Sequence, residues 1–381
     1  MDTIFLDPVV AFLKHNKINC PLTQEVTFLL DQGPMTIRSN AKDLSDHAMQ
    51  TFYYYPSQKR YTKTAETLEI NVYCIGNKAG HNGIYPDPRW GKIFFLLNRN
   101  LKFNQHSSRS FLYARGNGLE VLWRPYDILV SFHSDRRNSI HILVAESSTK
   151  NPLSVKKKLR LKGVKVFPPN LPDIIDLIKL LYIHQHQFFC IHGAAVGLKD
   201  IGIILTGPSG AGKSTTALAL VRDGFDLLSD ELTLIETDTQ KEIRIRGLLI
   251  SPMLVGNAVK ELKDLELSLD TKNNYQKTPL ILPRTIVQTS LNRWCRPEII
   301  LFLEKAARQT TTHKLIPIES LDAFTRLMAQ NLDLTTSFRE EKRIDAIITL
   351  TESCTSYRLK LGHTLDKISE LIHTCISRKT K

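Results

Sequence analysis

The segment 202–216, Gly-Ile-Ile-Leu-Thr-Gly-Pro-Ser-Gly-Ala-Gly-Lys-Ser-Thr-Thr, contains the residues whose chemistry is easiest to specify. Positions 207–214 fit the pattern G-x-x-x-x-G-K-S, in which glycines let the backbone turn its N–H groups inward around a phosphate. Lys213 would reach the β and γ phosphates of a nucleotide, and the Ser214 hydroxyl would bind Mg²⁺. We expect the phosphates to be held by Gly207, Pro208, Ser209, Gly210, Ala211, Gly212, Lys213, Ser214 and Thr215.

The elements on either side of this loop support the interpretation. The preceding run Ile201–Thr206 is apolar and β-branched, which predicts a buried strand. Residues 214–222 are rich in helix formers and stop shortly before Gly224, a residue suited to the end of a helix. A strand, loop and helix in this order favour a phosphate site over a glycine turn that joins two core elements and binds nothing.

Two carboxylates and a histidine lie at short distances from this loop in the sequence. Asp230 and Glu231 follow the next predicted strand, 225–229, at the edge where open α/β sheets gather their ligands. One carboxylate could hold Mg²⁺ while the other accepts a proton from an attacking hydroxyl. His192 precedes Lys213 by 21 residues, and Asp230 follows it by 17. The alternatives are structural: a strand-end histidine, and an aspartate that caps a turn.

This arrangement resembles HPr kinase/phosphorylase, whose kinase domain has an H-G strand start, a G-x-S-G-x-G-K-S loop and an acidic pair at the same offsets. The resemblance is specific for residues 188–250 and looser over the rest of the C-terminal half. Glu231 is a conservative change from the family's pattern, and the matching positions are His192, Gly193, Gly207, Ser209, Gly210, Gly212, Lys213, Ser214 and Asp230.

The resemblance implies a role for each matching side chain. Asp230 would be the general base that activates a serine hydroxyl, with His192 beside it and Lys213 at the phosphates. Ser214 and Glu231 would be Mg²⁺ ligands, and ATP would be the phosphoryl donor. Related bacterial proteins, which the N-terminal half resembles more closely, accompany peptide-modification systems and phosphorylate a serine of a precursor peptide.

One segment departs from the family. Its Glu-Ile-Arg-Gly sequence is Arg244-Ile-Arg-Gly247 here, so that a cation replaces a carboxylate. This leaves open the family's reverse reaction, the phosphate-driven removal of the phosphoryl group. Arg246 and Arg284 are candidates for holding the transferred phosphate or the peptide, because a guanidinium offers paired donors to phosphate oxygens. A structural role is the alternative for both.

Composition sets the class of protein and the cellular environment. With 381 residues, 42% of them hydrophobic, the chain is long enough for two globular domains. The six cysteines are widely spaced, which predicts free thiols in a reducing compartment. No apolar run approaches the roughly 18 residues of a membrane span, and Asp2 and Asp7 do not fit a basic signal region. We expect a soluble, cytoplasmic protein.

The two halves differ in charge and in pattern. Residues 1–165 hold 24 Lys and Arg against 13 Asp and Glu, nearly all of the net charge of +13. Residues 24–145 consist of short strand-like runs separated by turns, which predicts an all-β region that forms a mostly antiparallel sheet or barrel. We therefore predict a basic β-rich domain, 1–165, for recognition of a substrate or partner, followed by an α/β P-loop kinase domain of HPr kinase type, 166–381.

The predicted function is an ATP- and Mg²⁺-dependent kinase that phosphorylates a serine of a protein or precursor peptide. One alternative is a kinase of a small-molecule hydroxyl. The other is an ATP-dependent regulator whose basic domain contacts nucleic acid, which would show steep salt dependence of binding. The sequence does not identify the phosphoryl acceptor, the preferred nucleotide base or the oligomeric state, and it is compatible with an oligomer.

Overall fold

The structure is a computed structural model of the chain, and it describes only part of the 381 residues. The described residues are 9, 21–30, 32–58, 67–75, 102–104, 112–116, 119–124, 128–133, 139–145, 171–186, 188–237, 242–248, 253–255, 262, 265, 268–269, 277–283, 286–287, 293–305, 312–331, 340–362 and 364–379. They form two compact units: unit 1 comprises Met1–Thr51 and Tyr55–His186, and unit 2 comprises Phe52–Tyr54 and Gln187–Lys381.

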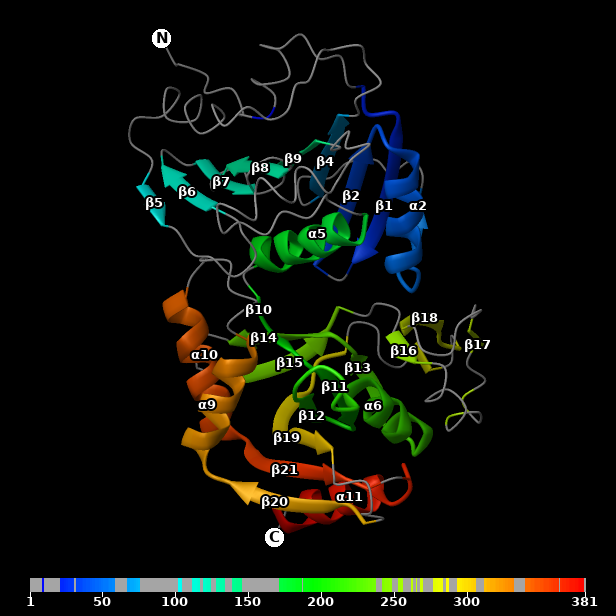
Figure 1. Cartoon of the computed structure of the whole chain (residues 1–381), viewed down its shortest axis with the longest axis vertical. Helices are drawn as coiled ribbons and strands as arrows, with labels where there is room; N and C mark the ends of the chain where they lie inside the picture. The colour runs from blue at the N-terminus through cyan, green and yellow to red at the C-terminus, as the bar shows by residue number, and fades with distance from the viewer. Residues whose placement is uncertain are drawn as a thin grey trace, which may run out of the picture. The chain divides into compact units, whose positions relative to one another are not determined.

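Unit 1 is built on a mixed sheet with the strand order β3-β1-β2-β4-β9-β8-β7-β6-β5 (Figure 1). Among the described strands, β2–β4 and β4–β9 pair in parallel, and the other neighbours pair antiparallel. The first two strands form a hairpin, with Leu30 opposite Gly33. The strands are β1 (Gln24–Leu30), β2 (Gly33–Ser39), β3 (Ser57–Gln58), β4 (Leu68–Ile75), β5 (Lys102–Asn104), β6 (Leu112–Gly116), β7 (Leu119–Arg124), β8 (Ile128–His133) and β9 (Ser139–Ala145).

Unit 1 also contains helices, which corrects the prediction of an all-β region. Helix α2 (Lys42–Thr51) lies within the span predicted to hold only strands. It buries one narrow stripe, Leu44, Ser45 and Ala48, and this is too short an apolar pattern to stand out in the sequence. Helix α5 (Leu171–Gln185) contacts α2. The division between the units therefore falls at His186 and not at residue 165.

Unit 2 is an α/β unit whose main sheet has the order β13-β11-β12-β19-β21-β20 (Figure 1). The neighbours β12–β19 and β19–β21 are parallel, and the other pairs are antiparallel. Helix α6 contacts β11, β12 and β13, whereas α9 and α10 contact β21, and α10 also contacts β19. The members are β11 (Ala194–Leu198), β12 (Ile201–Thr206), β13 (Asp226–Ser229), β19 (Arg296–Lys305), β20 (Lys314–Ile318), β21 (Thr355–Leu361), α6 (Lys213–Arg222), α9 (Ser320–Asn331), α10 (Glu340–Ser353) and α11 (Ile368–Lys379).

Two smaller sheets complete unit 2. The first, of order β10-β14-β15, is antiparallel and consists of β10 (Phe189–His192), β14 (Leu232–Thr237) and β15 (Ile243–Gly247). The second, of order β16-β18-β17, consists of β16 (Met253–Val255), β17 (Ser268–Leu269) and β18 (Lys277–Ile281). The predicted strands 201–206 and 225–229 and the predicted helix 214–222 are confirmed, with ends that differ by at most one residue.

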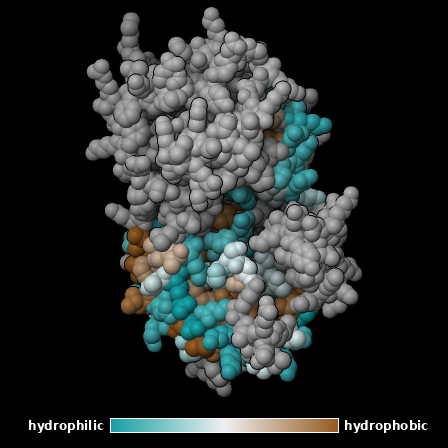
Figure 2. Space-filling view, viewed as in Figure 1, coloured by the Kyte–Doolittle hydropathy of each residue, from teal (hydrophilic) through white to brown (hydrophobic). Residues whose placement is uncertain are grey.

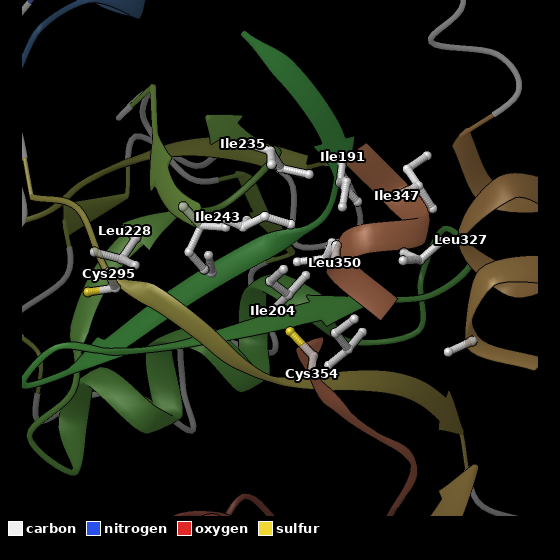
Figure 3. Close-up of a cluster of buried hydrophobic side chains, with 14 of the residues drawn as sticks. Ile191, Ile204, Leu228, Ile235, Ile243, Cys295, Leu327, Ile347, Leu350 and Cys354 are labelled. Carbon is white, nitrogen blue, oxygen red and sulfur yellow. The ribbon is translucent and has the colours of Figure 1, made fainter. Parts of the chain in front are cut away.

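One apolar cluster joins the main sheet, the first small sheet and two helices (Figure 3). Ile191 of β10, Ile204 of β12 and Ile235 of β14 meet Leu327 of α9 and Leu350 of α10 there. On the outer side of these helices, Leu321, Ile344 and Ile348 are exposed, and Figure 2 shows hydrophobic side chains at the surface over α9 and α10. Among the described helices, none combines the length and the apolar composition that crossing a bilayer requires.

Candidate functional site

The loop after β12 has the backbone conformation that the motif predicts. Gly207, Gly210 and Gly212 have φ angles of 150°, 77° and 100°, a region that favours glycine. A Cβ on Gly207 would lie 2.8 Å from the carbonyl oxygen of Leu303, so the loop also passes close to β19. The N–H of Ala211 donates to the carbonyl of Pro208 at 3.1 Å, which closes the turn between these glycines.

Helix α6 begins inside this loop. Its N-cap is Gly212, whose lack of a side chain leaves the first N–H groups of the helix without a side-chain cap. The ammonium of Lys213 donates to the carbonyls of Gly207 at 2.7 Å and Pro208 at 3.4 Å, so it lies over the loop. Open helix N–H groups, loop N–H groups and one ammonium form a donor set that fits a phosphate anion.

The histidine and the carboxylates lie where two strands leave one sheet and enter another. The chain passes from β10 of the small sheet to β11 of the main sheet at Gly193. The antiparallel partner strands make the reverse change, from β13 to β14, at Asp230 and Glu231. Because His192 pairs with Leu232 and Ala195 pairs with Ser229, the two places where the chain changes sheet lie side by side. We call this region, residues 192–194 and 229–232, the strand crossing.

Backbone and hydroxyl hydrogen bonds hold this crossing together. The N–H of Gly193 donates to the carbonyl of Glu231 at 3.0 Å. The carbonyl of Gly193 accepts from the hydroxyl of Thr233 at 3.0 Å and from that of Ser229 at 3.5 Å, and the two hydroxyls are 2.7 Å apart. The hydroxyls of Ser229 and Thr233, which flank Asp230 and Glu231 in the sequence, thus donate hydrogen bonds to Gly193, the residue after His192.

The crossing lies against the strand that leads into the phosphate loop. Ala194 pairs with Leu205, and a Cβ on Gly193 would lie 2.7 Å from the Leu205 carbonyl oxygen. The loop starts two residues after Leu205. The strand register therefore brings His192 and Asp230 to the edge of the sheet where the phosphate loop begins, as the spacing in the sequence predicts.

Burial differs among these side chains. Asp230 is 8% exposed, whereas Glu231, His192, Lys213 and Ser214 are half-buried. A buried carboxylate beside half-exposed polar groups is the arrangement expected where a proton is to be transferred out of contact with bulk water. The separate roles of Asp230 as base and Glu231 as metal ligand remain predictions.

The two arginines predicted to contact substrate have different outcomes. Arg246 of β15 is 3% exposed, and its guanidinium carbon lies 4.7 Å from the ring centroid of Phe188 and 4.6 Å from that of Trp294. Burial lowers the pKa of Arg246 to about 10. This placement fits the structural alternative for Arg246, and its contact with a substrate stays a prediction. Arg284 lies outside the described residues.

The sequence did not reveal the polar residues of α9. The hydroxyl of Thr206 donates to Oε1 of Gln330 at 2.5 Å, and the N–H of His192 donates to Oδ1 of Asn331 at 2.7 Å. These residues are 124 and 139 positions from their partners, so no local pattern identifies them. The sequence carries one signal of these contacts, the polar pair Gln330 and Asn331 at the end of an amphipathic helix.

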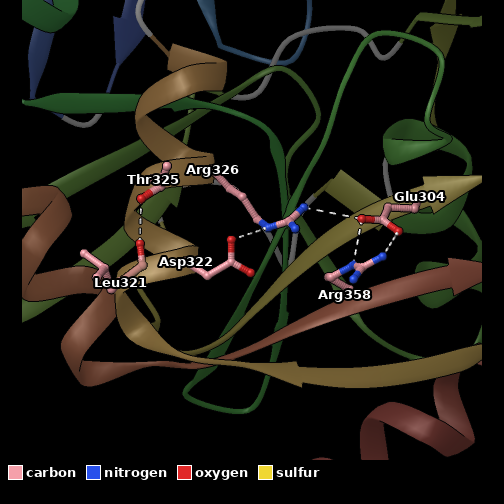
Figure 4. Close-up of polar contacts among 6 residues, drawn as sticks. All are labelled: Glu304, Leu321, Asp322, Thr325, Arg326 and Arg358. Carbon is pink, nitrogen blue, oxygen red and sulfur yellow. Dashed lines mark hydrogen bonds and ion pairs between the residues drawn. The ribbon is translucent and has the colours of Figure 1, made fainter.

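A second polar group, the Glu304 cluster, joins Glu304 near the end of β19 and Arg358 in the middle of β21 to helix α9 (Figure 4). Arg358 donates to both carboxylate oxygens of Glu304 at 2.8 Å, and Arg326 of α9 bonds Glu304 at 3.4 Å and Asp322 at 2.9 Å. The hydrogen bond from Arg358 lowers the pKa of Glu304. This cluster attaches α9 to β19, the parallel neighbour of β12, and to β21, the next strand in the sheet.

Comparisons with known proteins match part of unit 2. Residues 186–251 match the family described as HPr Serine kinase C-terminal domain. HPr kinase/phosphorylase of Mycoplasmopsis pulmonis is 29% identical over 154 residues, covering 33% of this chain and 48% of that protein. The protein of the same name from Bacillus mycoides is 30% identical over 128 residues, covering 28% of this chain and 41% of that protein.

The likeness is partial along the chain. This chain spans less than half the length of the two relatives that it matches. The solved structure of the Hpr(Ser) kinase/phosphatase from Coxiella burnetii aligns with a TM-score of 0.29 and 11% identity, covering 50% of this chain and 90% of that one. The resemblance predicted from the motifs is confirmed: the C-terminal half of this chain is similar to HPr kinase/phosphorylases, and residues 186–251 match the family model.

Proposed function

We propose that this chain is an ATP- and Mg²⁺-dependent kinase that transfers the γ-phosphoryl group to a serine hydroxyl of a protein or precursor peptide. The observation that supports the proposal most is the strand crossing, in which the ends of β10 and β13, next to His192 and the buried Asp230, run beside the strand that leads into the phosphate loop. A phosphate loop alone would support nucleotide binding without a defined acceptor. The family likeness of segment 186–251 supports a kinase.

In this proposal, each residue has one task in the transfer. The loop N–H groups and Lys213 hold the phosphates, while Ser214 and Glu231 would hold Mg²⁺, which would neutralise phosphate charge. Asp230 accepts the proton of the serine hydroxyl. The serine oxygen forms a bond to the γ-phosphorus as the bond between that phosphorus and the β–γ bridging oxygen breaks, and ADP leaves.

The acceptor is proposed to be a protein or peptide because of the N-terminal region. Residues 1–165 carry nearly all of the net positive charge, and a basic surface attracts acidic partners. The relatives are named for action on HPr, a protein. Arg246 and Arg284 remain candidates for contacts with the transferred phosphate or the peptide.

Asp230→Asn tests this proposal directly. The amide cannot accept the hydroxyl proton, so we expect phosphoryl transfer to serine-containing peptides to fall by about 10²-fold or more while ATP affinity is retained. The matched control is Asp223→Asn, the same chemical change at the C-cap of α6, which should leave transfer unchanged. Transfer by Asp230→Asn at the wild-type rate would remove Asp230 from the mechanism.

A further inference from the structure

Helix α9 ends in two polar residues that bond to two different strands. Gln330 accepts the hydrogen bond of the Thr206 hydroxyl, one residue before the phosphate loop. Asn331 accepts the hydrogen bond of the His192 N–H. One helical turn is thus attached both to the strand that supplies the histidine and to the strand that leads into the loop.

The hydrogen bond that Asn331 accepts takes the place of a bond to a neighbouring strand. Strand β10 is an edge strand of the small sheet, and β14 is its neighbour among the described strands. An edge strand directs every second N–H away from its neighbour, and a buried N–H without an acceptor is costly. The amide oxygen of Asn331 fills this position for His192 at 2.7 Å.

The amide of Asn331 is itself held in one orientation. Asn331 is fully buried, and its Nδ2 donates to the carbonyl of Leu327 at 2.7 Å, one helical turn earlier. Arg343 of α10 donates to the backbone carbonyl of Asn331 at 3.1 Å. An arginine at the last carbonyls of a helix is favourable because of the helix dipole. The acceptor that meets His192 is therefore fixed by α9 and α10 together.

Resting on the proposed kinase function, we infer that Asn331 is a positioning residue that sets His192, and through the adjoining crossing Asp230, against the phosphate loop. Gln330 holds the loop side of the same alignment at Thr206. Neither side chain is proposed to touch substrate. A group displaced by about 1 Å in a phosphoryl-transfer site lowers the rate by about 10²-fold, so a hydrogen bond at this point controls the rate without binding substrate.

Asn331→Leu removes the acceptor at nearly constant volume. We expect kcat for phosphoryl transfer to fall by about 10- to 100-fold, with the KM for ATP within about 2-fold of wild type. Asn331→Asp keeps an oxygen for the His192 N–H and should recover most of the lost kcat. The matched control Met328→Ala removes packing from the same turn but neither hydrogen bond, and kcat should stay near wild type.

A double-mutant cycle separates positioning from general stability. If Asn331 acts by aligning the side chains of His192 and Asp230, Asn331→Leu lowers kcat strongly in the wild-type background but little in a background that carries both His192→Ala and Asp230→Asn, where neither aligned side chain remains. An equal loss in both backgrounds, or no loss in wild type, would overturn the inference. A loss in Met328→Ala as large as that in Asn331→Leu would overturn it as well.

The inference and the proposed function fail in different ways. If the wild-type protein phosphorylates no serine acceptor, the kinase proposal fails, and amide hydrogen exchange at His192 still tests the bond. Loss of the acceptor in Asn331→Leu should speed exchange of that N–H by about 10-fold. Unchanged exchange at His192 would show that Asn331 does not hold it.

Discussion

Both units carry polar side chains on their sheets, but at different positions along the strands. In unit 1, Arg38 of β2 bonds Glu25 of β1 at 2.6 Å and Glu69 of β4 at 3.3 Å, within three adjacent strands. In unit 2, His192, Thr206 and Asp230 lie where strands end. Side chains within a strand are satisfied by neighbouring strands, whereas those at strand ends can face a ligand. The comparison separates polar groups that hold a sheet from those that, in the proposed function, lie at the phosphate loop.

The largest effect is expected at the strand ends of unit 2. Lys213→Met removes the ammonium that lies over the loop carbonyls and would meet the phosphates. We expect phosphoryl transfer to fall by about 10²- to 10³-fold, the scale of a lost charge-stabilising donor. Nucleotide titration and transfer assays would measure it, with Lys314→Met on the exposed face of β20 as the control. Equal losses in both variants would contradict a specific role for Lys213.

Gly247→Ala tests whether the strand crossing depends on close backbone packing. A Cβ there would lie 1.8 Å from the carbonyl oxygen of Leu228 and 2.5 Å from Cβ of Ser229, so the chain just before Asp230 must move. We expect a loss of about 1–3 kcal/mol in the free energy of unfolding, together with weaker phosphoryl transfer.

Gly224→Ala provides the comparison for this variant. Gly224 has a φ of 95°, but a Cβ there meets no atom within 4 Å, so the expected loss comes from backbone strain alone, about 1 kcal/mol. Transfer should stay near wild type because Gly224 lies away from the crossing. Denaturant unfolding and phosphoryl-transfer assays on both variants would separate the two effects. A Gly247→Ala protein with wild-type transfer activity would show that the strand crossing tolerates movement.

Acid should affect the two units in different pH ranges. His186 lies on the Tyr182 ring at a centroid distance of 4.5 Å, and burial lowers its pKa from 6.5 to about 4. Between these values the unfolded state binds the proton and the folded state does not, so unit 1 loses stability as the pH falls below 6.5. The pKa of Glu304 is lowered from 4.5, so its contribution in unit 2 persists until the pH falls below that value.

Amide hydrogen exchange of α5 and α9 between pH 7 and pH 4 would measure these ranges separately. We expect protection of α5 to weaken first, and His186→Phe to remove most of that pH dependence. If α5 in His186→Phe weakens over the same pH range as in wild type, another group causes the effect.

The sequence predicted those parts of the candidate site for which a local sequence pattern and the chemistry of the residues agree. The loop 207–214, its flanking strand and helix, and the positions of His192 and Asp230 follow from motif spacing and short-range periodicity. Helix α2 was missed because its buried stripe is one turn long, and the bonds from Gln330 and Asn331 were missed because their partners are far away in the sequence. Tertiary packing also places Arg246 against two aromatic rings, which its residue type alone does not indicate.

The smallest effect is expected within the strands of unit 1. Arg38→Met removes the ion pairs with Glu25 and Glu69, whose side chains are partly exposed, and such pairs are worth about 1 kcal/mol or less. We expect a loss of that size in the free energy of unfolding of unit 1, measured by denaturant titration, with unchanged ATP affinity. If Arg38→Met instead weakened nucleotide binding as Lys213→Met does, position along the strand would not distinguish structural from functional polar residues in this chain.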